Sequence, residues 1–210
     1  MENNEINLFN LGIFTSKIPE DLLKKLKIEC LNFINKKKMI SGLTSQGVSD
    51  HYYLEDNNEE LFDFLSFWVK KYIEKYDYLK TIKVFKGCAP LIFLKPWFNI
   101  QKKGEFIPSH THDGVLSYTI WIQIPNLNPN TNNKFAGCFE IQYQNILGAR
   151  VDNHILLDKN SEGSFLLFPS LLHHCVYPFF NTDEIRISIS GNICFDNKVI
   201  FEKEGVTNEI

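Results

Sequence analysis

The sequence has few cysteines, and none of them stands in a recognisable metal-binding or disulfide pattern. Five are present, at positions 30, 88, 138, 175 and 194, an odd number that never shows the spacing Cys-x-x-Cys. This distribution argues against a disulfide framework and against a zinc finger. We therefore expect free thiols that pack as small apolar side chains.

Long apolar runs and a large net charge are also missing. Stretches such as Leu91–Leu94 fall far short of the roughly 18 to 20 apolar residues that a membrane span needs. The amino-terminal residues lack the basic start and apolar stretch of a secretory signal. We thus expect no membrane crossing and a cytoplasmic protein. A formal charge of -3 gives no electrostatic reason to expect a nucleic-acid partner.

Apolar residues are plentiful by comparison, at 44% of the 210 residues, with 14% aromatic. This composition can fill one sizeable core, so we expect a single domain over residues 1–210. The spacing of apolar residues changes partway along the chain. Helical spacing predicts supporting helices at about 15–80, and alternation predicts a mainly β core of the jelly-roll type at about 90–200.

Two amphipathic helices are expected in the first part. The first begins with Pro19, Glu20 and Asp21 and ends at Lys36–Lys38. The second runs from about Asn58 to Tyr78, with one aromatic and aliphatic stripe that we interpret as core.

From about Pro90 the period falls to two, which predicts short strands with two distinct faces. In the segment 185–193, isoleucines alternate with an arginine, serines and an asparagine. One face of this strand is therefore apolar, while the other carries a cation and small polar groups.

Two distant motifs contain the histidines of interest. In an extended strand, residues two apart point the same way, so His110 and His112 would present both imidazoles to one side. The stretch 163–174 predicts a strand and a turn that deliver His174 as a third ligand. Three protein ligands on one face leave positions for a bidentate co-substrate and dioxygen, which is typical of non-haem iron(II) oxygenases.

Asp113 rivals His112 as the second ligand, because a bend at Gly114 could bring its carboxylate round. His173 would point to the opposite side from His174 if the chain is extended there, so we place it at the surface or behind the ligands. His51 and His154 fit no pattern.

Arg186 follows His174 by twelve residues and lies in the alternating segment described above. A guanidinium beneath a metal site can hold a carboxylate in a two-pronged ionic pair, and Ser188 on the same strand face could add a hydroxyl donor. This pair suits the far carboxylate of 2-oxoglutarate.

Together these motifs resemble those of the small 2-oxoglutarate/iron(II) oxygenases found in bacteria and especially in phages. The resemblance covers about Trp97 to Phe195. It rests on Trp97-Phe98-Asn99-Ile100, Gly104, His110-Thr111-His112, Leu116-Ser117, the stretch 135–140, Phe168-Pro169-Ser170, His174 and the stretch 182–188. It implies a double-stranded β-helix that uses Fe(II), O2 and 2-oxoglutarate as co-substrate, with hydroxylation of a substrate and release of succinate and CO2.

Carried over by position, the resemblance implies roles for individual residues. His110, His112 and His174 would bind iron, and Arg186 with Ser188 would anchor 2-oxoglutarate. Asn99 could donate a hydrogen bond to the co-substrate. Trp121 could form a wall of its site, with ordinary packing as the alternative.

Two other functions remain open at this stage. A cupin-like metalloprotein that does not use 2-oxoglutarate would also fit the glycine and histidine spacing, but it lacks the usual glutamate after the histidine pair and gives Arg186 no role. A jelly roll without a redox metal, acting only in structure or binding, is the third interpretation. The prime substrate and the oligomeric state are not determined, although exposed aromatic residues of the helices could pair subunits.

Overall fold

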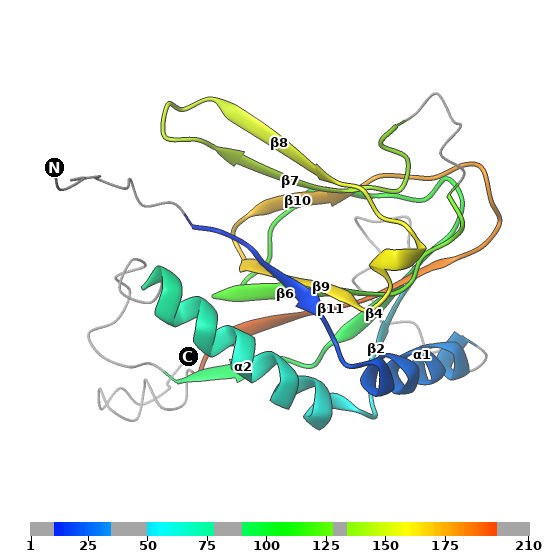
Figure 1. The fold of residues 1–210 in the computed structure, drawn as a ribbon, viewed down its shortest axis with the longest axis horizontal. Helices are drawn as coiled ribbons and strands as arrows, with labels where there is room; N and C mark the ends of the chain where they lie inside the picture. Colours follow the sequence, from blue (N-terminus) through cyan, green and yellow to red (C-terminus); the bar gives the residue numbers. More distant parts are fainter. Residues whose placement is uncertain (1–10, 35–49, 78–89, 128–133, 197–210) are drawn as a thin grey trace, which may run out of the picture.

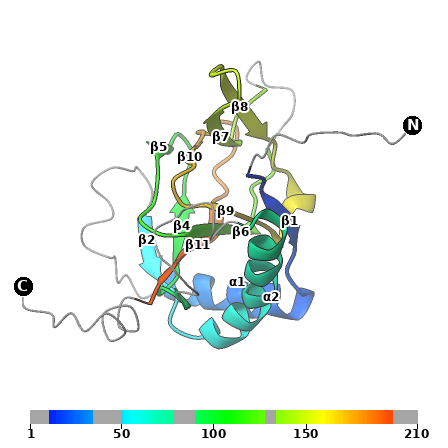
Figure 2. The ribbon, with the colours of Figure 1, turned by 90° about the vertical axis from the view of Figure 1, so that its left-hand side faces the viewer.

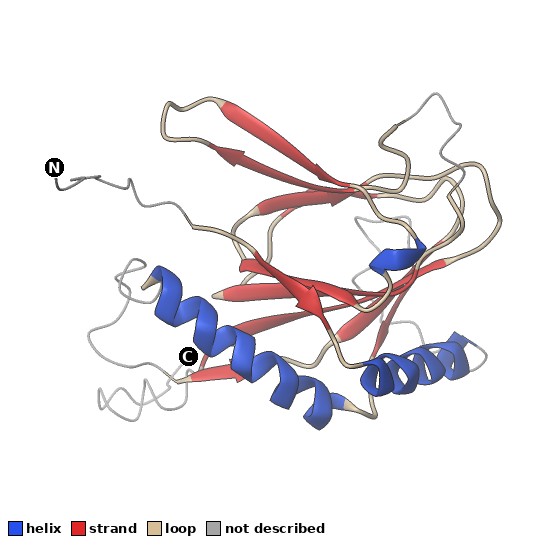
Figure 3. Ribbon diagram, in the orientation of Figure 1, coloured by secondary structure: helices blue, strands red, loops and turns tan. Residues whose placement is uncertain are grey.

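The computed structural model describes residues 11–34, 50–77, 90–127 and 134–196, and all structural statements refer to these (Figure 1). Two antiparallel sheets face each other, and both helices lie on the outer side of the larger sheet (Figures 1 and 3). The predicted helix end at Lys36–Lys38 lies outside the described residues.

The two predicted helices are present. Helix α1 (Glu20–Ile34) begins directly after Pro19 and buries Leu22, Leu26 and Cys30, which recur at four-residue spacing on one face. Helix α2 (Asn58–Tyr76) ends two residues before the predicted Tyr78, where Asp77 adopts a left-handed conformation.

A buried carboxylate joins the two helices. Glu29 of α1 is 5% exposed, and its side chain accepts hydrogen bonds from the backbone N–H groups of Glu55 and Asp56, both at 2.7 Å. A third bond comes from Asn57 Nδ2 at 2.8 Å. Glu29 therefore fixes the turn from which α2 begins.

The larger sheet has seven strands. Along its main path the order is β1 (Phe14–Lys17), β9 (Ser164–Pro169), β6 (Leu116–Gln123), β11 (Arg186–Phe195), β4 (Trp97–Gln101) and β2 (Asp50–Tyr53), while β3 (Leu91–Phe93) pairs with β11. The smaller sheet has the order β5 (Ile107–His110), β10 (His173–Val176), β7 (Phe139–Gln144) and β8 (Arg150–Ile155). A short 3-10 helix, η2 (Lys159–Ser161), precedes β9. Two facing antiparallel sheets confirm the predicted jelly roll.

The period-two pattern sorts the side chains between the two sides of the larger sheet. The apolar positions of β11, including Ile187 and Ile189, belong to one hydrophobic cluster with Leu26 of α1 and Leu65 of α2. The alternate, polar positions face the smaller sheet. Figure 2 shows this arrangement from the side, with the helices and the smaller sheet on opposite sides of the larger one. The main core therefore lies beneath the helices, and the space between the sheets holds a smaller apolar cluster and a cavity.

Neither described helix has the length and apolar character required to span a bilayer.

Candidate active site

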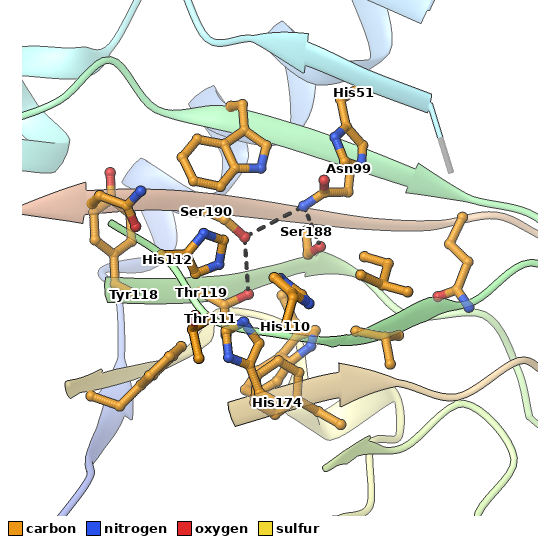
Figure 4. Close-up of a pocket in the computed structure, with 18 of the residues that line it drawn as sticks. His51, Asn99, His110, Thr111, His112, Tyr118, Thr119, His174, Ser188 and Ser190 are labelled. Atoms are coloured by element: carbon orange, nitrogen blue, oxygen red, sulfur yellow. Dashed lines mark hydrogen bonds between the residues drawn. The ribbon is translucent and has the colours of Figure 1, made fainter. Parts of the chain in front are cut away.

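Three histidines meet on the inner side of the smaller sheet. His110 is the last residue of β5 and lies directly opposite His174 of β10 in the strand register. His112 follows two residues later, and its backbone N–H donates to Ser170 O at 2.9 Å, which fixes the turn after β5. The imidazole centroids are 4.3 to 5.0 Å apart (Figure 4).

Hydrogen bonds to the backbone leave one nitrogen available on two of the three rings. His110 Nδ1 donates to Pro108 O at 2.8 Å, and His174 Nδ1 donates to Leu172 O at 2.9 Å. These bonds hold the proton on Nδ1 and leave the Nε2 lone pair for a ligand. One candidate ligand atom from each of the three histidines lies within 4.8 Å of the others. The arrangement can hold a metal ion.

Burial keeps these imidazoles neutral. It lowers the pKa of His174 to about 3 and that of His112 to about 4, and it also lowers the pKa of His110. A positive charge on His110 would further disfavour protonation of His112 and His174. Neutral imidazoles have their lone pairs free at neutral pH, and they suit iron, zinc, copper or nickel.

The opposite wall of the site is polar and comes from the larger sheet. Asn99 of β4 is 6% exposed and donates from Nδ2 to the hydroxyls of Ser188 and Ser190 on β11, both at 3.4 Å. Ser190 in turn contacts the hydroxyl of Thr119 on β6 at 3.5 Å. Figure 4 shows this row facing the three histidines. Trp121 of β6 packs edge-on against Phe139 at the side of the row.

Arg186 is a buried cation that has no acidic partner among the described residues. It is 3% exposed, and no carboxylate of the described chain lies within ion-pair distance of it. Burial lowers its pKa to about 10, so it remains charged at neutral pH. One of its N–H groups donates to Gly137 O. A buried charge normally has a counterion, so this side chain marks a place for an anion.

A cavity of about 550 Å³ joins these groups. Arg186 and Asn192 lie at opposite ends of its β11 wall, because they are the first and last of four alternate positions. The cavity wall beyond His112 includes Tyr53, Leu94, Lys95 and Trp97. The space is large enough for a small-molecule ligand at the Arg186 end and a second one at the other end.

Every residue predicted for the site lines this cavity, but they do not lie equally deep. His110, His112 and His174 form the group that could hold a metal ion, whereas Asp113 is exposed and is not part of this group. His173 is exposed, as expected from its position next to His174.

The sequence analysis missed β2 and its two cavity residues. His51 is 8% exposed and lies opposite Asn99 in the register, and Tyr53 lies opposite Trp97. A strand of four residues shows too little alternation of polar and apolar side chains to be predicted from the sequence. The ring of Trp97 is 5.7 Å from that of His112, so this side of the cavity adjoins the histidines directly.

Comparison with known proteins decides the identity of the site. A sequence family described as "Putative 2OG-Fe(II) oxygenase" matches residues 95–192, which include all three histidines and Arg186. The part of the chain that carries the site therefore matches the 2OG-Fe(II) oxygenase family. The protein is an oxidoreductase that uses iron(II), 2-oxoglutarate and, by implication, dioxygen. The oxygenase prediction is confirmed, in preference to the cupin-like and the purely structural alternatives.

Solved structures show the same fold. A prolyl-4-hydroxylase of Pseudomonas putida is 15% identical, with a TM-score of 0.61, over 88% of this chain and 92% of that chain. A prolyl hydroxylase of Trichoplax adhaerens, in complex with a hypoxia inducible factor oxygen degradation domain peptide fragment, is 16% identical, with a TM-score of 0.53. The match covers 90% of this chain and 85% of that chain. HygX of Streptomyces hygroscopicus, with nickel and 2-oxoglutarate bound, is 10% identical, with a TM-score of 0.50, over 89% of this chain and 84% of that chain. A search of curated proteins found no match.

Proposed function

We propose that this oxygenase hydroxylates a C–H bond of a prime substrate, with His110, His112 and His174 as the iron ligands. The observation that carries the proposal is the position of three neutral imidazoles across one cavity from a buried arginine that has no acidic partner in the described chain. When bound, iron(II) and 2-oxoglutarate supply the redox chemistry: one atom of O2 becomes the new hydroxyl group, and the other enters succinate as 2-oxoglutarate loses CO2.

Arg186 and Ser188 would anchor the far carboxylate of 2-oxoglutarate. The guanidinium uses one N–H group on Gly137 O and keeps other donors for a two-pronged pair. Ser188 Oγ accepts from Asn99 Nδ2, so its own hydroxyl hydrogen is free to be donated. Asn99 thus acts through Ser188, and Trp121 forms a wall that keeps water away from the ionic pair.

His112, and not Asp113, is the second ligand in this proposal. The ring of His112 lies 4.9 Å from His110 and 5.0 Å from His174. Asp113 is exposed at the rim of the cavity, where its negative charge only partly offsets the lowering of the His112 pKa by burial. A set of three neutral ligands leaves the iron with one more positive charge than a set containing a carboxylate.

The prime substrate would approach from the end of the cavity beyond His112. Tyr53 and Trp97 lie opposite each other there on β2 and β4, and Trp97 adjoins His112. Proline rings in extended peptides commonly pack on aromatic side chains. A prolyl residue, the substrate named for two of the similar structures, is therefore the first class to test.

Anaerobic titration of the purified protein with iron(II) and then 2-oxoglutarate tests the site. We expect a visible charge-transfer band on chelation that is absent in His174→Ala. His173→Ala is the matched control, because this neighbouring histidine is exposed and should leave the band intact. Iron binding without any response to 2-oxoglutarate would contradict the proposal.

Prolyl peptides test the substrate class separately. Consumption of 2-oxoglutarate in air should increase when a proline-containing peptide is added, and Tyr53→Ala should abolish this increase while the affinity for 2-oxoglutarate stays the same. An equal response to the same peptide with alanine in place of proline would argue against a prolyl substrate.

Three further predictions belong to this proposal. We expect the chain to act as one domain, in the cytoplasm, and to form a homo-oligomer through exposed apolar residues of the helices, such as Phe67 (57% exposed) and Ile28 (60% exposed). Light scattering of the purified protein would measure the oligomeric state, and a monomeric mass would contradict the last of these.

A further inference from the structure

A polar cluster lies on the outer face of the smaller sheet, away from the cavity. Its centre is Glu140 of β7, which is 3% exposed although its neighbours Phe139 and Ile141 point into the core between the sheets. Tyr177 OH and His154 Nε2 both donate to Glu140 Oε2 at 2.7 Å. None of Glu140, His154 and Tyr177 lines the cavity. We call these three residues the outer cluster.

The outer cluster holds the turn at residues 134–138. The ring of Phe135 stacks on that of His154, with centroids 3.9 Å apart and planes inclined by 17°. The backbone N–H of Tyr177 donates to Cys138 O at 2.9 Å, and that of Gly137 donates to Pro178 O at 2.9 Å. The start of the turn is therefore held by His154, and its end is held by the backbone of Tyr177 and Pro178.

The same turn provides the one acceptor that the described chain offers to the Arg186 side chain. Gly137 has a φ of +69°, and in this conformation its carbonyl accepts from the guanidinium. A second connection runs through Gln101, which lies opposite Arg186 in the register and donates from Nε2 to Tyr177 O at 3.1 Å. The outer cluster thus contacts two of the groups that surround the guanidinium.

We infer that Tyr177 and His154 are positioning residues for 2-oxoglutarate, which act by fixing Glu140, the turn at 134–138 and so the direction of the Arg186 guanidinium. The inference rests on the proposed role of Arg186. A two-pronged pair with a carboxylate tolerates little change in the plane of the guanidinium. Loss of one donor to a buried carboxylate displaces the group that has lost its partner, and this displacement reaches Gly137 O through the turn.

Tyr177→Phe tests the inference, since it removes a single hydroxyl and keeps the ring. The measurement is calorimetric titration of 2-oxoglutarate into the nickel-loaded full chain, with nickel affinity measured separately. We expect about tenfold weaker binding of 2-oxoglutarate, comparable to the loss of other outer-shell partners, and unchanged nickel affinity. Lys24→Ala is the control, because it removes an exposed pair with Glu20 on α1, on the far side of the larger sheet from the outer cluster.

A double-mutant cycle separates positioning from general loosening of the fold. In an Arg186→Lys background, which lacks the planar fork, Tyr177→Phe should cause no further loss of 2-oxoglutarate affinity. The same loss in both backgrounds, or no loss in either, would overturn the inference. Phe135→Leu, which removes the stacking on His154, serves in the same cycle if Tyr177→Phe does not fold. If Arg186→Met binds 2-oxoglutarate as well as the unmodified protein, the proposed anchor fails instead, and the two failures can be told apart.

Discussion

Replacing Arg186 by methionine should keep or raise the melting temperature of the ligand-free protein and should weaken the binding of 2-oxoglutarate. The guanidinium is 3% exposed and has no acidic partner in the described chain, so without ligand it is a buried charge with incomplete compensation. Methionine has a similar length and no charge. Because apolar replacement of a buried ionic group is often neutral or stabilising, the melting temperature of the ligand-free protein should stay the same or rise.

The affinity for 2-oxoglutarate should fall in the same variant. Removal of one partner from a buried, hydrogen-bonded charge pair costs about 3 kcal/mol, which is roughly a 150-fold loss of affinity. Ser188, a neutral donor, would remain next to the anchor on the same strand face. The thermal stabilisation that saturating 2-oxoglutarate gives to the unmodified protein should therefore disappear at the same concentration.

Differential scanning fluorimetry of nickel-loaded protein, with and without 2-oxoglutarate, measures both effects in one experiment. Lysine at position 186 is an informative companion, because it keeps the charge but loses the planar fork. It should bind with intermediate affinity. The reasoning is refuted if the methionine variant retains the full stabilisation by 2-oxoglutarate, since the cation would then not be the anchor.

Three more predictions concern other parts of the molecule. His112→Ala should abolish metal-dependent stabilisation whereas Asp113→Asn keeps it, as measured by thermal shift with nickel; the reverse result would make Asp113 the ligand. Glu29→Ala leaves the three donors at 55–57 without their acceptor and should lower the free energy of unfolding in urea by about 2 kcal/mol, with the affinity of the folded protein for 2-oxoglutarate unchanged. Burial raises the pKa of Glu140, but hydrogen bonds from Gln142 and Tyr177 and the charge of His154 lower it more, so the net shift is downward. The stability that this carboxylate provides is thus present above its unfolded pKa and is lost as pH falls through the lower folded pKa. The difference in urea midpoint between the unmodified protein and Glu140→Gln should therefore narrow below about pH 4.5. A difference in midpoint that stays constant with pH would contradict the downward pKa shift.

The fold class and the main site residues could be predicted because they depend on local periodicity. Alternation in the segment 185–193 correctly separated the isoleucines of the core from Arg186 and Ser188 in the cavity. The two-residue spacing of His110 and His112 correctly placed both rings on one side of the chain. Each of these patterns is a property of a single strand, so it is visible in a few consecutive residues.

The partners across the cavity could not be predicted in the same way. His51 and Tyr53 belong to a short strand whose sequence carries little signal, and only its pairing with β4 places them beside Asn99 and Trp97. Glu140 occupies an outward position in β7, where a charged residue is expected to be solvated. Its burial depends on Tyr177 and His154, which come from elsewhere in the chain.

The sequence by itself determined which residues could be proposed for the chemistry: a histidine pair at strand spacing, a third histidine after a strand and turn, and an arginine with a serine on one strand face. Only the tertiary structure decided how they meet. The register of β10 against β5 sets His174 opposite His110, the turn after β5 brings in His112 in place of Asp113, and the left-handed conformation of Gly137 aims its carbonyl at Arg186. These are contacts between segments far apart in the chain, and the free energy that selects them comes from packing two whole sheets and two helices together, which no local pattern contains.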